Sequence, residues 1–184
     1  MAQLDKRTLQ RIRVPLGFIF AAVFVVFARP NVLTLSVGSG IAVVGLLIRA
    51  WASGHIRKAE QLAVSGPYGF TRNPLYLGSF VLGVGFTVAA GVWWLALVFC
   101  ALFIGIYLPV MRVEAEDMRN IFGGGFDEYE RNVPLFLPRP TAVKQADTRF
   151  DLALYLRYRE YQAAIGAAVA MGILAAKAYF LGPL

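Results

Sequence analysis

The sequence has little of the chemistry on which disulfides, metal sites and acid–base catalysis usually depend. Its 184 residues include one cysteine, Cys100, and one histidine, His55. A lone cysteine forms no intramolecular disulfide, and Cys100 lies in an apolar run, so we interpret it as a packing residue. We interpret His55 as an interfacial, hydrogen-bonded side chain. With one residue of each type, far apart, the sequence predicts no zinc or iron site.

Charge is also scarce and unevenly placed. Only 16% of the residues are charged, whereas 58% are hydrophobic. Residues 73–111 carry no charge, and Arg29 is the only charged residue in 14–48. A charge at the centre of a bilayer costs at least about 2.5 kcal/mol, so long uncharged stretches are typical of membrane spans. We predict an all-α, polytopic integral membrane protein with a single domain over residues 1–184 and a cytoplasmic cofactor pocket.

The apolar runs divide the chain into about five transmembrane helices. A span needs about 20 residues, and the uncharged stretch after Pro74 is long enough for two spans, broken near Ala90 and Gly91. We expect Lys177, near the end of the last run, to extend toward the membrane surface. The predicted spans are 14–28, 32–51, 75–89, 92–110 and 163–181, and the polar segments between them are 52–74 and 111–162.

The basic residues predict the orientation. Fifteen of the 18 Lys and Arg residues lie in 1–13, 52–74 and 111–162, whereas the opposite ends of the spans have only Arg29 and Lys177. Basic residues favour the cytoplasmic side. The N-terminus and both polar segments are therefore predicted to be cytoplasmic, with the C-terminus on the opposite side. The net charge of +7 is mainly an orientation signal, and nucleic-acid binding is the poorer interpretation.

Each polar segment has one stretch that suggests a ligand site. In the first, Gly66 and Pro67 favour a turn, and Pro74 suits the first turn of a helix. Free N–H groups at that helix end can hold a carboxylate, while the rings of Tyr68 and Tyr76 can contact an adenine or a sulfonium cation. The alternative is a membrane re-entry turn with interfacial tyrosines.

The second stretch follows the fourth predicted span. Here Glu114 can accept hydrogen bonds from an amino or ribose group, and Arg112 can steer a substrate carboxylate through paired hydrogen bonds. The alternative is that both are solvated residues at a helix mouth. We expect residues 112–121 to continue the fourth helix and Gly123–Gly125 to end it. Residues 150–161 are expected to form either an interfacial helix or a simple tether to the fifth span.

The order and spacing of these residues resemble a known family, the isoprenylcysteine carboxyl methyltransferases and related phospholipid methyltransferases. The likeness covers Glu60 to Tyr76 and Glu114 to Pro138. The motif residues are Gly66-Pro67-Tyr68, Arg72-Asn73-Pro74-Leu75-Tyr76, Glu114, Phe122-Gly123, Phe126, Tyr129 and Val133-Pro134.

The resemblance implies an S-adenosylmethionine-dependent methyltransferase, similar to the isoprenylcysteine carboxyl O-methyltransferases. The chain departs from the family pattern where Asn73 replaces a histidine, where Ala115 interrupts paired glutamates, and where Arg112 only approximates the substrate-facing arginine. We assign Arg112 to the catalytic site. The implied cofactor-binding residues are Glu60, Gln61, Leu62, Ala63, Tyr68, Asn73, Pro74, Leu75, Tyr76 and Glu114.

The expected acceptor is a lipid-like small molecule or a lipidated group in the membrane. A carboxylate or thiolate attacks an activated methyl group unaided, whereas an amine must first lose a proton, and the sequence offers no strong base for this step. We therefore favour a carboxyl or thiol acceptor. The alternatives are a phospholipid amine N-methyltransferase and a non-catalytic membrane protein whose polar segments bind a partner.

Overall fold

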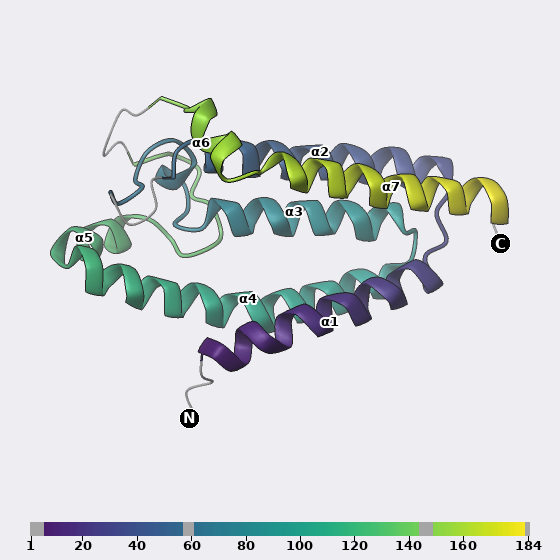
Figure 1. Ribbon diagram of the computed structural model, residues 1–184, viewed down its shortest axis with the longest axis horizontal. Coiled ribbons are helices and arrows are strands. Elements are labelled where there is room, and N and C mark those ends of the chain that lie inside the picture. The colour runs from purple at the N-terminus through teal and green to yellow at the C-terminus, as the bar shows by residue number, and fades with distance from the viewer. Residues whose placement is uncertain (1–5, 57–60, 144–148, 183–184) are drawn as a thin grey trace.

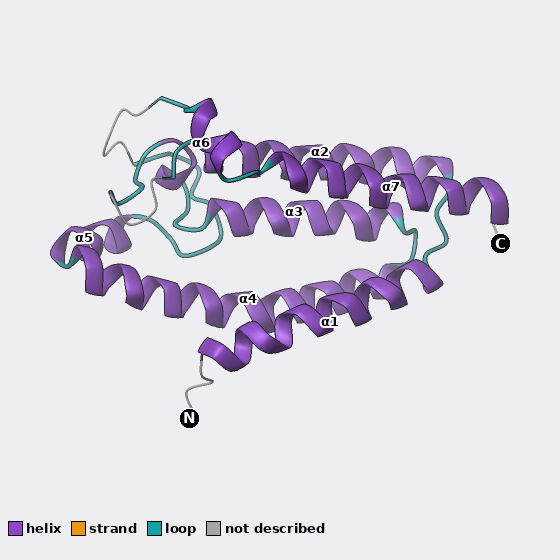
Figure 2. Cartoon of the chain, viewed as in Figure 1, coloured by secondary structure: helices purple, strands orange, loops and turns teal. Residues whose placement is uncertain are grey.

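A computed structural model describes residues 6–56, 61–143 and 149–182, and these residues form helices and loops without a strand (Figure 2). The predicted all-α class is confirmed. The helices are α1 (Lys6–Phe27), α2 (Val32–Ser53), the 3-10 helix η1 (Gly66–Gly69), α3 (Pro74–Ala89), α4 (Trp93–Phe122), α5 (Gly124–Asn132), α6 (Leu152–Arg157) and α7 (Tyr161–Leu181).

The long helices lie in two groups. Helices α2, α3 and α7 run side by side, while α1 lies against α4 (Figure 1). The α1–α2 and α3–α4 connections lie at one end, which we call the turn end. The loops that hold η1, α5 and α6 lie at the other, which we call the site end. The fold thus brings the two polar segments together at the site end.

The closest helix contact is between α2 and α3, and it depends on glycine. A Cβ atom added at Gly45 would lie 2.4 Å from the backbone nitrogen of Leu82, and one at Gly85 would lie 2.5 Å from that of Ala42. Each position therefore has space only for hydrogen. Small residues that let helix backbones approach closely are typical of membrane helix packing, where burial from water does not drive association.

The turn end is held by hydrogen bonds between the two connections. Asn31 caps α2, with its side chain accepting from Thr34 N, and Arg29 N donates to Ala90 O at 2.7 Å. Gly91 adopts a φ of 68°, which completes the break predicted at this position. Lys177 also lies at this end, and its extension toward the membrane surface stays a prediction. Its Nζ donates to Val25 O and Val26 O, because the last carbonyls of α1 have no partner within their own helix.

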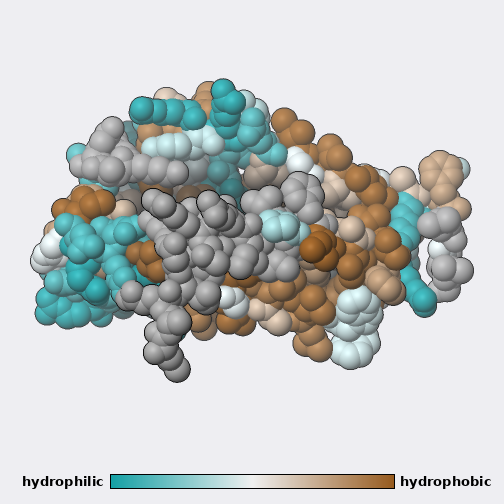
Figure 3. Space-filling model, turned by 60° about the horizontal axis from the view of Figure 1, so that its bottom comes forward, coloured by the Kyte–Doolittle hydropathy of each residue, from teal (hydrophilic) through white to brown (hydrophobic). Residues whose placement is uncertain are grey.

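Three helices in the described residues are long and apolar enough to cross a membrane: Val32–Ser53, Trp93–Phe122 and Tyr161–Phe180. Helix α3 is apolar but shorter. Many large hydrophobic side chains on these helices are exposed, and hydrophilic residues gather mainly at the site end (Figure 3). This arrangement is that of a membrane protein. Five spans and their orientation remain predictions.

Four of the long helices begin within two residues of the predicted spans, whereas α1 begins at Lys6, eight residues before the predicted span 14–28. Helix α4 continues without a break to Phe122, and Gly123 ends it with a φ of 55°, as predicted. The helix predicted over 150–161 is wrong in extent. It covers only Leu152–Arg157, because the chain reverses at Arg159, which has a φ of 52°.

The contact between α2 and α3 predicts different effects for two glycines of the same helix. Gly45→Ala should lower the free energy of unfolding by about 1–3 kcal/mol, because the new methyl group meets the backbone of α3. Gly40 has no atom within 4 Å of an added Cβ, so Gly40→Ala should leave stability unchanged or raise it by up to about 1 kcal/mol. Thermal unfolding in detergent measures both. Equal effects would contradict the close contact.

Candidate functional site

The two motif stretches are joined by hydrogen bonds into one structural unit. The segment after α5 runs beside the loop between η1 and α3, so residues more than 60 positions apart in the sequence become neighbours. The bonds are Arg72 N to Pro134 O, Asn73 Nδ2 to Leu135 O, Thr71 Oγ1 to Phe136 O, Arg139 N to Phe70 O and Val143 N to Gly69 O, all between 2.9 and 3.0 Å.

A small apolar core supports this unit from the side of α5. Phe126, Tyr129 and Val133 are buried together, and Leu62 packs against them. Tyr129 also donates its hydroxyl hydrogen to the backbone oxygen of Tyr68 at 2.8 Å. Burial raises the pKa of Tyr129 well above its ordinary value of 10, although the nearby charge of Arg72 lowers it, so the hydroxyl remains a donor. Tyr129 therefore fixes the position of the Gly66–Gly69 turn.

Tyr76 and Glu114 form a direct side-chain link between the two motif stretches. Tyr76 lies in the first turn of α3, and its hydroxyl donates to Glu114 Oε1 on α4 at 3.0 Å. The ring of Tyr76 also contacts that of Tyr107, with centroids 5.4 Å apart. Both members of the pair are only half-buried, so they remain accessible to a ligand. The structure thus brings together two residues that the sequence predicts to bind the cofactor.

Tyr68 has the clearest unused hydrogen-bonding group in the site. Its side chain is 5% exposed, and its hydroxyl has no hydrogen-bond partner among the described residues. Burial, and then the charges of Tyr129, Tyr158 and Glu160, hold its pKa far above its ordinary value of 10. The hydroxyl is therefore a donor, and a buried donor without an acceptor costs about 1–3 kcal/mol. A bound ligand that accepts a hydrogen bond from the Tyr68 hydroxyl would remove this cost.

The residues around Pro74 form the N-terminus of α3. Asn73 occupies the position before the helix, where its side-chain amide binds the oxygen of Leu135 and so ties the motif stretches together. Pro74 is buried as the first helical residue, and Leu75 follows it half-buried. Leu77 N donates the first backbone hydrogen bond of the helix to Asn73 O at 3.0 Å.

Other predicted site residues lie farther from this pair. Arg112 is exposed and is about 200° around α4 from Glu114, so the two side chains leave the helix in opposite directions. Gln61 is exposed, Leu62 belongs to the apolar core described above, and Ala63 is half-buried. Glu60 lies outside the described residues.

An ion-pair network next to the site was not anticipated from the sequence. Glu130 on α5 pairs with both Arg72 and Arg119, and Arg119 also bonds Asp127 at 3.0 Å. Burial alone would raise the pKa of Glu130, but the hydrogen bonds and charges of Arg72 and Arg119 outweigh it and hold the pKa below the ordinary 4.5. The network fixes Arg72, the residue just before Asn73.

A second polar cluster joins α7 to the site end. Arg49 on α2 bonds Ser79 on α3 and pairs with Glu160 at the start of α7. Gly78 makes space for it, since a Cβ there would lie 2.6 Å from Arg49 Cγ. The signal for this cluster was the position of Arg49 within an apolar span, where a charge usually has a partner.

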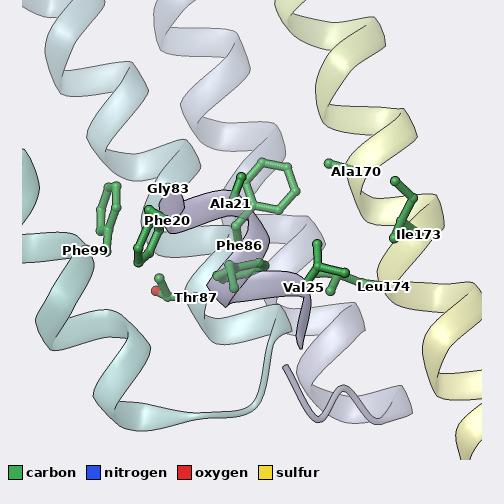
Figure 4. Close-up of a pocket in the computed structure, with 11 residues that line it drawn as sticks. Phe20, Ala21, Val25, Gly83, Phe86, Thr87, Phe99, Ala170, Ile173 and Leu174 are labelled. Carbon is green, nitrogen blue, oxygen red and sulfur yellow. The ribbon is translucent and has the colours of Figure 1, made fainter. Parts of the chain in front are cut away.

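An apolar cavity of about 310 Å³ lies between the two groups of helices, toward the turn end (Figure 4). Its lining comes from α1, α3, α4 and α7 and includes Phe20, Phe86, Phe99 and Leu174. Aromatic contacts connect it to the site: Phe20 with Phe99, Phe99 with Phe103, Phe103 with Tyr107, and Tyr107 with Tyr76, with centroids 4.6 to 6.4 Å apart.

The Glu130 network predicts how stability changes with pH. Because folding lowers the pKa of Glu130, its contribution is fully present above the unfolded value of about 4.5 and disappears as the pH falls through the folded pKa. Glu130→Gln should therefore lower the unfolding temperature at pH 7, and the gap from the unmutated protein should narrow below pH 4.5. Exposed Glu128 is the matched control. A gap that did not depend on pH would contradict the assignment.

Comparisons with known proteins agree with this geometry. The model of the family described as "Phospholipid methyltransferase" matches residues 33–125, which include Tyr68, Tyr76 and Glu114. The nickel-cobalt-cadmium resistance protein NccN of Alcaligenes xylosoxydans xylosoxydans is 34% identical over 113 residues, which are 60% of this chain and 51% of NccN. The cobalt-zinc-cadmium resistance protein CzcN of Cupriavidus metallidurans is 34% identical over 128 residues, 66% of this chain and 56% of CzcN.

The chain thus spans about half the length of these two curated relatives. No solved structure matches it significantly. The described residues contain no group of three or more His, Cys, Asp or Glu side chains placed to hold a metal ion. The family match covers half of the chain and includes the first motif stretch and both members of the Tyr76–Glu114 pair. The chain therefore belongs to the phospholipid methyltransferase family.

Proposed function

We propose that this protein transfers the methyl group of S-adenosylmethionine to a lipid-like acceptor in the membrane, most favourably to a carboxyl or thiol group. Family membership supports methyl transfer at a membrane. The observation that carries the cofactor assignment is the hydrogen bond between Tyr76 and Glu114, which joins two distant motif stretches in a half-buried position.

The residues present fit this cofactor. The unpartnered hydroxyl of Tyr68 would donate to one of its oxygen or nitrogen atoms, and the positive end of the α3 dipole would attract its carboxylate. Glu114 would accept from its ammonium or ribose groups. Asn73 and Pro74 would shape the helix end. When bound, the cofactor supplies an electrophilic methyl group on a sulfonium cation. Gln61, Leu62 and Ala63 would contribute only at the edge of this pocket.

The protein's own task is then positioning. Because the methyl donor is already activated, the site must bring a nucleophile close in the correct direction, which can be worth about 7–11 kcal/mol. An ionised carboxyl or thiol needs no base, which is why we prefer it to an amine. The exposed Arg112 would act at a distance, by attracting an anionic acceptor to the site end.

The apolar cavity supports a lipid-like acceptor, because it lies beside the same helices and connects to Tyr76 through aromatic rings. The names of the two relatives describe resistance to metal cations. Resistance describes the behaviour of a cell and not a reaction, so it is compatible with modification of a membrane component. We place no metal ion in the proposed reaction.

Titration calorimetry with S-adenosylmethionine tests the cofactor pocket. The unmutated protein should bind saturably, and Glu114→Gln and Tyr76→Phe should each weaken binding about tenfold or more, because each loses a hydrogen bond that involves a charged group. Glu116→Gln, at an exposed position on the same helix, should bind normally. A folded protein that binds no S-adenosylmethionine would favour the non-catalytic, partner-binding alternative. Methylation of phospholipid amines alone would favour the amine alternative.

Two buried tyrosines should respond differently to the same substitution. Tyr68→Phe removes an unpartnered hydroxyl, so it should leave the stability of the ligand-free protein unchanged or higher while weakening cofactor binding about fivefold.

Tyr129→Phe is the matched control. It removes the hydrogen bond to Tyr68 O, so it should cost about 1 kcal/mol of stability. Thermal unfolding and calorimetry on both variants separate the two effects. A Tyr68→Phe protein that is destabilised yet binds normally would exclude the assigned role of this hydroxyl.

A further inference from the structure

Exposed side chains of both α1 and α7 line the apolar cavity, and we call the boundary between these two helices the α1–α7 seam. Val25 on α1 and Ile173 on α7 both line the cavity, and their side chains are 41% and 48% exposed. In Figure 4 these two residues lie where the two helices face each other. Both helices belong to the apolar part of the molecule, so an opening between them faces the hydrocarbon of a surrounding bilayer.

The lining indicates what the cavity accepts. The only side-chain polar group among its described lining residues is the Thr87 hydroxyl, which donates to Val84 O at 2.9 Å within its own helix. Phe20, Phe86 and Phe99 provide broad apolar surfaces. With no hydrogen-bonding group left over, the cavity favours a hydrocarbon chain over any polar ligand.

The position of the cavity matches the length of a lipid chain. Gly83 and Thr87 line it from α3, and they are seven and eleven residues beyond Tyr76 on the same helix. At 1.5 Å per residue the cavity thus begins about 10 Å from Tyr76 and extends to about 16 Å from it. An extended chain of moderate length spans this distance, and the aromatic contacts between Tyr76 and Phe99 follow the same direction.

The seam is built by parts of the chain outside the family match. Helices α1 and α7 lie before and after residues 33–125. Lys177 joins them at the turn end by donating to the oxygens of Val25 and Val26, one turn beyond Ile173. At the site end, the pair between Arg49 and Glu160 holds α7 to α2. Helix α7 is therefore fixed near both ends and lines the cavity between them.

We infer that the seam between α1 and α7 is the lateral entrance for the hydrocarbon chain of the methyl acceptor, and that Ala170 and Ile173 on α7 determine which chains fit. The inference rests on the proposed methyl transfer. It gives α7 the role of selecting the acceptor by its chain, while Tyr76 and Glu114 act at the site end. The substrate class is a single-chain amphiphile that resides in the bilayer.

The experiment uses the full chain in phosphatidylcholine nanodiscs, with a palmitic acid analogue that carries a diazirine at its chain end. Photolysis followed by peptide mass spectrometry locates the labelled residues. Ala170→Phe places a ring in the cavity. Ala168→Phe adds the same ring to the same helix, at an exposed position about 200° away, and is the matched control. Ala21→Phe places a ring in the same cavity from α1. It provides a second test if Ala170→Phe fails to fold.

The expected result is labelling of Phe86 and Phe99 that falls several-fold in Ala170→Phe and in Ala21→Phe but is unchanged in Ala168→Phe. Labelling spread over exposed positions, and equal in all proteins, would overturn the inference. Calorimetry with S-adenosylmethionine on the same samples separates the two proposals. Cofactor binding without cavity labelling overturns the entrance alone, whereas cavity labelling without cofactor binding overturns methyl transfer and leaves a site for hydrocarbon chains.

Discussion

The close packing of α2 against α3 is the constraint on which the rest of the structure depends. Glycines on both helices remove the side chains that would separate them, so the backbones come into direct contact over most of their length. In a membrane, moving an apolar surface from lipid into a helix contact gains little free energy. Close van der Waals packing therefore stabilises the helix pair, in place of the hydrophobic effect that stabilises a soluble core. The same contact places Arg49 beside Ser79, and it positions the N-terminus of α3, where Tyr76 lies.

From this pair of helices the site is built by hydrogen bonds between segments that are distant in sequence. The loop before α3 has few backbone partners of its own, and the segment after α5 supplies them. Buried backbone groups need such partners, because an unsatisfied one costs about as much as a lost hydrogen bond. The two motif stretches are therefore structurally dependent on each other. Against this background, the unpartnered hydroxyl of Tyr68 is an exception that points to a ligand.

Much of the fold could be predicted from the sequence, because the length of a hydrophobic run and the residues that end a helix are local properties. Uncharged runs gave α2, α3 and α7 to within two residues, whereas α1 begins eight residues before its predicted span. Gly91 and Gly123 lie at the ends of helices, as predicted. The prediction failed where a local pattern competed with a tertiary contact. The 150–161 stretch looks helical throughout, yet the chain reverses at Arg159 and Glu160 pairs with Arg49. Lys177 also binds carbonyls of α1, a contact that no local pattern reveals.

The sequence by itself determined the helical class, the membrane setting and the identity of the motif residues, because composition and spacing carry that information directly. Only the tertiary structure decided that Tyr76 meets Glu114, that Arg112 leaves α4 on the other side, and that Asn73 ties two segments together. It also decided which helices line the apolar cavity. The physical reason is that these features depend on helix rotation and on the distance between backbones. Both are set by packing between residues far apart in the chain.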